Sequence, residues 1–167
     1  MLDELFKAIF SGPPSYKIYS IFLLILIMLW LSWSLKISQP KPDLDIMMYN
    51  YGKKISLPKG STQIKFEPII INNGKAIARH VNLHIKFSNQ LSLTFDRNIW
   101  TAYRENNYSV LEYNGGIANV IYPEHPMGLK DLIVTVPNNF EGVVEIPFWI
   151  ICENMRRKEG RLAIEIK

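Results

Sequence analysis

The longest stretch without a charged residue lies near the start of the chain, between Lys17 and Lys36. Ile18 to Leu35 is almost entirely apolar, and a helix of that length spans about 27 Å, close to the hydrocarbon core of a bilayer. The pattern therefore predicts a transmembrane helix over 16–37. Its flanking aromatic and basic residues are typical of membrane–water interfaces, and six are expected to lie there: Tyr16, Lys17, Tyr19, Trp30, Trp33 and Lys36.

A cleaved signal peptide is the alternative for this segment, with Ser32-Trp33-Ser34 as its cleavage site. An uncleaved anchor in the cell membrane is favoured, because the segment before the apolar run is long and contains two prolines. The side of the membrane on which the rest of the chain lies is weakly determined. Lys53 and Lys54, which follow the span, tip the count of basic residues slightly towards the cytoplasm.

Residues 1–12 have a separate, helical pattern. The apolar positions recur at spacings of three and four, which places them on one face of a helix: Leu2, Leu5, Phe6, Ile9 and Phe10. Pro13 and Pro14 then end it. Because so short a helix is marginal in water, we expect it to lie in the membrane interface, with self-association or regulation as the alternative.

After a polar linker over 38–43, the apolar period changes to two. Residues 81–88, 143–151 and 161–167 alternate between apolar and polar side chains, as half-buried β-strands do. Turn residues separate these segments from further candidate strands at 44–50, 63–72, 91–95, 108–113, 117–122 and 131–136.

Seven to nine short strands in 44–167 predict an immunoglobulin-like antiparallel β-sandwich, so the fold class is mainly β with one transmembrane helix. The segment 96–107 is the least regular and is expected to form a long loop or a short helix.

Three stretches resemble β-sandwich domains of the CARDB type, named for cell-adhesion-related domains in bacteria. They are Pro42-Asp43-Leu44, the run IIINNGKAIARHVNLHIKF over 69–87, and VEIPFWI over 144–150 followed by the strand LAIEI. In the middle run we expect Asn73-Gly74 to form a turn with positive φ, and Ala78 to allow close approach of strands. The resemblance implies a binding or spacer module and names no ligand.

Composition narrows the function further. The 167 residues carry 19 Lys and Arg against 15 Asp and Glu, a net charge of +4 that is spread along the chain. No nucleic-acid partner is expected from so weak a positive balance. Cys152 is the single cysteine, which excludes an internal disulfide and a thiolate zinc site. We expect its thiol to be buried and inert.

Catalytic and metal-binding patterns are absent from the sequence: it contains no nucleophile elbow, no dinucleotide-binding glycine motif and no P-loop. On a strand, His80 and His84 would lie about 13 Å apart on one solvated face, too far for one metal ion. His125 is expected in a loop, and Asp43 with Asp45 lacks the further carboxylates of a calcium site. We therefore expect no cofactor, no metal and no enzymatic activity.

Two groups of residues are candidates for binding. Apolar residues on strand faces that should be polar form a candidate partner face, namely Ile69, Ile71, Trp149 and Ile151. The alternative is that the segment 96–107 covers them, with Ile99 and Trp100 packed against the sheet. The hairpin tip Arg156, Arg157 and Lys158 is a candidate contact for an anionic lipid or phosphate, with a solvated tip as its alternative.

The sequence thus favours a single-pass, non-enzymatic membrane protein whose sandwich binds a protein partner or self-associates. Tyr103, Arg104, Tyr108 and Tyr113 would suit a small-molecule ligand without specifying one. The alternative is a ligand-sensing membrane effector of a prokaryotic defence or toxin-like system that acts through oligomerisation. The polar residues of the span lie near its ends, which argues against a polar pore.

Overall fold

The computed structural model describes residues 14–49, 52–60, 63–130, 132–138 and 140–167. The chain divides into two compact units, Met1–Gln39 and Pro40–Lys167. The predicted interfacial helix over 1–12 lies outside the described residues.

The first unit contains one long helix, α2 (Pro14–Ser38), which is somewhat longer than the predicted 16–37. Proline is well suited to the first turn of a helix, where its missing N–H has no intrahelical partner. The window Ile18–Leu35 is long and apolar enough to cross a membrane, and none of it is buried within the structure. This distinguishes α2 from the core helix of a globular domain. Tyr19, Trp30 and Trp33 are exposed at the two ends of that window. The side chains of Tyr16, Lys17 and Lys36 lie outside what the structure describes.

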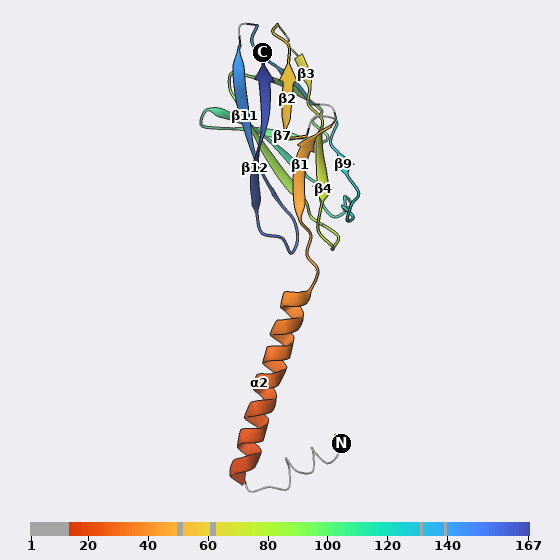
Figure 1. The fold of residues 1–167 in the computed structure, drawn as a ribbon, viewed down its shortest axis with the longest axis vertical. Helices are drawn as coiled ribbons and strands as arrows, with labels where there is room; N and C mark the ends of the chain where they lie inside the picture. Colours follow the sequence, from red (N-terminus) through yellow and green to blue (C-terminus); the bar gives the residue numbers. More distant parts are fainter. Residues whose placement is uncertain (1–13, 50–51, 61–62, 131, 139) are drawn as a thin grey trace. The chain divides into compact units, whose positions relative to one another are not determined.

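The second unit is a β-sandwich (Figure 1). One layer is a six-stranded sheet in the order β2 (Lys54–Leu57), β12 (Lys158–Ile166), β11 (Gly142–Ile151), β5 (Asn82–Ser88), β8 (Tyr108–Asn114) and β7 (Thr101–Glu105). The other layer holds two three-stranded sheets. One has the order β1 (Leu44–Met48), β4 (Pro68–Asn72) and β9 (Met127–Gly128). The other has the order β3 (Gln63–Lys65), β10 (Leu132–Thr135) and β6 (Ser92–Phe95). The predicted mainly-β sandwich is confirmed. Its pairing is antiparallel except between β2 and β12, which run parallel.

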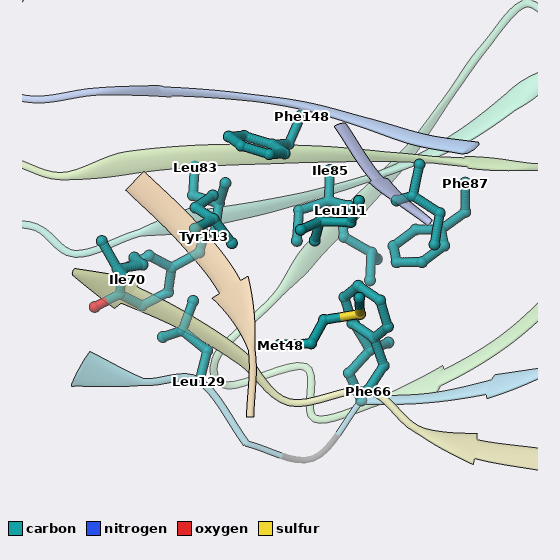
Figure 2. Packing of buried hydrophobic residues seen from close by; sticks show 14 of the residues in the cluster. Met48, Phe66, Ile70, Leu83, Ile85, Phe87, Leu111, Tyr113, Leu129 and Phe148 are labelled. Carbon is teal, nitrogen blue, oxygen red and sulfur yellow. The ribbon is translucent and has the colours of Figure 1, made fainter. Parts of the chain in front are cut away.

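Alternating side chains of the two layers meet to form the core. Figure 2 shows Ile85 and Phe148 of the six-stranded sheet pointing towards Met48, Phe66 and Ile70 of the opposite layer. All five side chains are almost completely buried. Burial of apolar area on this scale is what holds two sheets face to face.

Three predicted elements differ from the observed ones. The strand expected over 63–72 is two strands in different sheets, because Pro68 has no N–H for a central ladder. Residues 117–122 form no strand beyond a single bridge from Ala78 to Ile121. The segment 96–107 is neither a long loop nor a helix, since it contains edge strand β7 and a tight turn with Asn106 at positive φ.

Buried Asn72 fixes the start of the first strand. Its Oδ1 accepts hydrogen bonds from the backbone N–H groups of Asp43 (3.2 Å) and Gly74 (3.0 Å). Its Nδ2 donates to the carbonyls of Ala76 (2.7 Å) and Ile121 (3.1 Å). Gly74 does not have the predicted positive φ. Glycine is required there because a Cβ would collide with the backbone of 41–43.

Candidate binding surface on the six-stranded sheet

The register of the six-stranded sheet brings distant residues into one row on its outer face. Trp149 of β11 lies opposite His84 of β5. His84 in turn lies opposite Glu112 of β8, and Glu112 opposite Thr101 of β7. Tyr103, two residues further along β7, points to the same face because side chains alternate along a strand. The row therefore joins four strands, and it brings together His84 and Trp149, which are 65 residues apart in the sequence.

Trp149 is held between two neighbours. The His84 ring stacks on the indole with centroids 3.6 Å apart and planes at 15°. The Arg157 guanidinium carbon lies 4.7 Å from the indole centroid, a distance at which a cation is attracted to the ring. Arg157 is itself paired with Glu159 at 2.8 Å. We name this group of residues, His84, Trp149 and Arg157 with Tyr103 and Glu112, the tryptophan surface.

The ring nitrogens of His84 are both engaged by neighbouring strands. Nε2 faces the Glu112 carboxylate at 3.4 Å, and Nδ1 lies 3.1 Å from the Tyr103 hydroxyl. Burial lowers the pKa of His84, and the charge of Glu112 opposes this only in part. A neutral ring with its proton on Nε2, facing the carboxylate, leaves Nδ1 to accept a hydrogen bond from the Tyr103 O–H. Burial also raises the pKa of Tyr103, so its phenol stays protonated.

This arrangement fixes aromatic and hydrogen-bonding side chains against one another. The neutral imidazole of His84 contacts a carboxylate through one nitrogen and a hydroxyl through the other. The Tyr103 phenol, with its raised pKa, is a hydrogen-bonding group at neutral pH. The tryptophan surface therefore presents ordered aromatic and polar groups at the outer face of the sheet.

A groove of about 390 Å³ runs beside Trp149. Three cations on its walls are each paired with a carboxylate: Lys86 with Glu105 at 2.8 Å, Arg157 with Glu159 at 2.8 Å, and Arg161 with Glu145 at 2.7 Å. The groove thus combines apolar surface from Trp149 and Pro147 with balanced charge. A larger hollow of about 610 Å³ is lined by residues of β6, of β7, including Tyr103, of β8 and of the turn after β5.

The four residues of the predicted partner face do not form one face. Ile69 and Ile71 belong to β4, and Trp149 and Ile151 to β11, in the opposite layer. All four are half-buried and alternate with core residues, so the two pairs point out of the sandwich on opposite sides. Trp100 is buried in the core and Ile99 packs against that core, as the alternative expected, but neither is the residue seen in contact with Trp149. Trp149 is contacted by His84 and Arg157 instead.

The predicted hairpin tip does not gather three free cations. Arg157 turns to Trp149, and Lys158 begins β12 and pairs with Asp43 at 2.7 Å. Arg156 is exposed and enters no ion pair within the part of the chain that the structure describes. The tip therefore lacks the convergent geometry of an anion site.

The histidines and the cysteine were predicted with mixed success. His80 precedes β5 with φ 51° and is exposed, so it does not share a strand face with His84. His84 is 7% exposed rather than solvated, because Trp149 covers it. His125 lies in a loop as predicted. The Cys152 thiol is buried, as predicted, and burial raises its pKa to about 11. Within the described ranges no three His, Cys, Asp or Glu side chains cluster as a metal site.

Sequence reasoning missed the tryptophan surface as a unit. The alternation of 143–151 showed that Trp149 faces outward, and that of 81–88 showed the same for His84. Neither pattern contains the register that puts them opposite each other. Tyr103 was named only as a side chain suited to a ligand, and its place on an edge strand could not be predicted, because β7 is exposed at every position and has no alternation to detect.

No protein family and no curated protein matches the sequence. Solved structures with similar folds include the CARDB domain of the PF1109 protein from Pyrococcus furiosus, in complex with di-metal ions (10% identity, 77% of this chain, 96% of that chain, TM-score 0.43). Another is a type III cohesin module of the ScaE scaffoldin from Ruminococcus flavefaciens (14% identity, 79% and 91%, TM-score 0.45). A third is the collagen-binding subdomain of the Enterococcus faecalis surface protein ACE (13% identity, 78% of this chain, 98% of that chain, TM-score 0.41). At these scores the fold assignment depends on the strand order described above, and no ligand or partner is carried over.

Proposed function

We propose that this chain is a single-pass, membrane-anchored, non-enzymatic interaction module that binds a protein partner through the tryptophan surface. The observation that carries the proposal is Trp149, a large aromatic side chain on the outer face of a sheet. The His84 ring stacks on it with ring centroids 3.6 Å apart, and the Arg157 guanidinium carbon lies 4.7 Å from the indole centroid. A side chain that is already ordered loses little conformational entropy when a partner covers it.

The composition of the surface favours a protein over a small anion. Trp, Tyr and Arg dominate the energetics of protein interfaces, and all three types occur on this surface. The paired charges around the groove offer donors and acceptors in balance, which suits the polar rim of an interface. A partner can be another protein or a second copy of this chain, and confinement to a membrane would strengthen weak contacts between copies.

Support for the anchor comes from α2. Its apolar side chains are exposed all around the helix, an arrangement that is stable in lipid and unfavourable in water. Replacing Leu26 and Leu29 by Arg should release the chain from membranes, at about 2.5–3.5 kcal/mol per charge on insertion scales. Full retention of the double variant after an alkaline carbonate wash would show that α2 is not the anchor.

The binding proposal is tested with two neighbouring variants in native membranes. Trp149→Ser should abolish the cross-linked product that contains the partner while the domain remains folded, because Trp149 lies outside the core. Phe148→Ala, at an inward position that is 3% exposed, should instead unfold the domain, at a cost of about 3–5 kcal/mol. Unchanged cross-linking by Trp149→Ser, or equal loss of folded domain in both variants, contradicts the proposal.

A further inference from the structure

Several loops gather at the end of the sandwich where the chain enters it. The register places the start of β1 beside the end of β4, and the start of β5 beside the ends of β8 and β11. The loops 73–81, 115–126 and 152–157 therefore lie at one end of the domain, together with residues 40–43 (Figure 1). We name this end the entry end.

Backbone hydrogen bonds make the entry end a fixed surface. Lys75 N–H donates to the Lys41 carbonyl at 3.2 Å, and Glu153 N–H donates to the Arg79 carbonyl at 2.9 Å. Gly115 N–H likewise donates to the Val81 carbonyl at 2.8 Å. Each bond joins segments that are far apart in sequence, so the loops are held by one another as well as by their strands.

The entry end exposes large apolar side chains. Ile117 is 82% exposed, more than any large apolar side chain of α2, and Tyr122 and Ile77 are exposed as well. Ile117 is not in a frayed segment. The turn that presents it is closed by a 3.2 Å hydrogen bond from Asn119 N–H to the Gly115 carbonyl. Several exposed apolar side chains at one end of a domain are typical of a protein or membrane interaction site.

Exposed cations lie in the loops at the same end of the domain. Four exposed cations at this end enter no ion pair among the residues described: Lys41, Lys75, Arg79 and Arg156. The carboxylates of the same loops are Glu124 and Glu153, while Asp43 is neutralised by Lys158 at 2.7 Å. Exposed apolar groups among unpaired cations are the combination that binds an anionic lipid surface.

The length of the chain limits how far this end can lie from the end of α2. The helix ends at Ser38, and the Lys41 carbonyl is already bonded within the sandwich. Only Gln39 and Pro40 lie between them, and extended residues reach about 3.5 Å each. The connection therefore spans about 10 Å, whatever angle the two units adopt.

We propose that the entry end is a lipid-binding surface, with Ile117, Tyr122 and Ile77 at the membrane interface and Lys75, Arg79 and Arg156 on anionic headgroups. This inference rests on the proposed anchoring by α2. It sets the strands of the six-stranded sheet end-on to the membrane, so the tryptophan surface, which begins two residues from the entry end on the outer face of that sheet, faces sideways and stays open to a partner.

The test uses the full chain reconstituted in vesicles of phosphatidylcholine mixed with phosphatidylglycerol. A polarity-sensitive dye is attached to Ala118→Cys, beside Ile117, and in a control to Gln90→Cys in the exposed turn after β5, at the opposite end. Cys152 stays unlabelled under mild conditions, because it is buried and its pKa is raised to about 11.

The dye at 118 should shift to the blue and be quenched by a lipid-borne quencher, and the dye at 90 should do neither. Ile117→Asp should remove the shift, whereas the matched variant Val143→Asp, at an exposed apolar site of β11, should leave it. Replacing Lys75, Arg79 and Arg156 by Glu should weaken contact by at least about fivefold per cation.

A dye at 118 that only an aqueous quencher reaches would overturn the inference. A dye shielded from water but not quenched from the lipid would also overturn it, because protein would then cover the surface. Either result leaves the proposed function intact when the chain resists carbonate extraction. Extraction of the unmodified chain by carbonate would instead refute the anchor itself.

Discussion

Replacement of Asn72 by Ala should destabilise the domain by about 2–4 kcal/mol. The side chain is fully buried and makes four hydrogen bonds to the backbone of three segments. Each such bond contributes about 0.5–1.5 kcal/mol net, and a buried group left without a partner costs more. The Ile121 carbonyl keeps a second donor, the Ala78 N–H at 2.9 Å, which lowers the cost of that loss. The assay is urea unfolding of residues 40–167, the compact unit with its own core.

Asn72→Asp separates hydrogen bonding from packing, because the two side chains have nearly the same shape. An ionised carboxylate keeps the two accepted bonds and places an oxygen against the carbonyls of Ala76 and Ile121. Protonation restores one donor, so the pKa of the introduced carboxyl group should be raised in the folded state and the deficit relative to the natural chain should shrink as pH falls. A deficit below about 1 kcal/mol for the alanine variant, or one that grows on acidification for the aspartate variant, would refute this account.

Two further predictions concern stability. Burial lowers the pKa of folded His84 below its unfolded value near 6.5, so the unfolded chain binds the proton first as the pH falls. The stability of the domain should therefore fall as pH drops from about 6.5 towards the folded pKa. In a plot of urea midpoint against pH, His84→Phe should flatten this part of the curve. Glu165, whose pKa is lowered chiefly by its hydrogen bond from Ser56, acts only at more acidic pH. Gly74→Ala should lower the stability measured by thermal unfolding by about 1–3 kcal/mol, because the added Cβ collides with the backbone of 41–43. The control Gly116→Asn, at a positive φ with open space around it, should cost less than about 1 kcal/mol. Equal costs for the two variants would contradict the predicted collision at Gly74.

The sequence was informative wherever one strand face is buried. The alternation of 143–151 and 161–167 predicted β11 and most of β12, since a strand with one face in the core must repeat every two residues. Edge strands could not be predicted from this alternation. All five positions of β7 are exposed, so no apolar period exists there, and the two-residue strand β9 is too short to have one.

The candidate surface was beyond sequence reasoning for a related reason. The positions of Trp149 and His84 on outer faces were predictable, but their contact depends on the register of two strands from distant parts of the chain. Asn73-Gly74 was predicted to form a turn, but the roles that Asn72 and Gly74 have in the structure are different. They hold residues 41–43 through contacts that exist only once the sandwich has formed.

The parallel pairing of β2 with β12 has a consequence for biosynthesis. β12 lies between β2 and β11, and Lys167 N–H still donates to the Leu57 carbonyl at 3.0 Å. The sheet therefore cannot close until residues 158–167 have left the ribosomal exit tunnel, long after α2 has emerged. Until then, β2 and β11 lack their shared neighbour, and their unpaired edges are open to incorrect pairing. Completion of this fold thus follows the emergence of α2, which is by then already available to the insertion machinery.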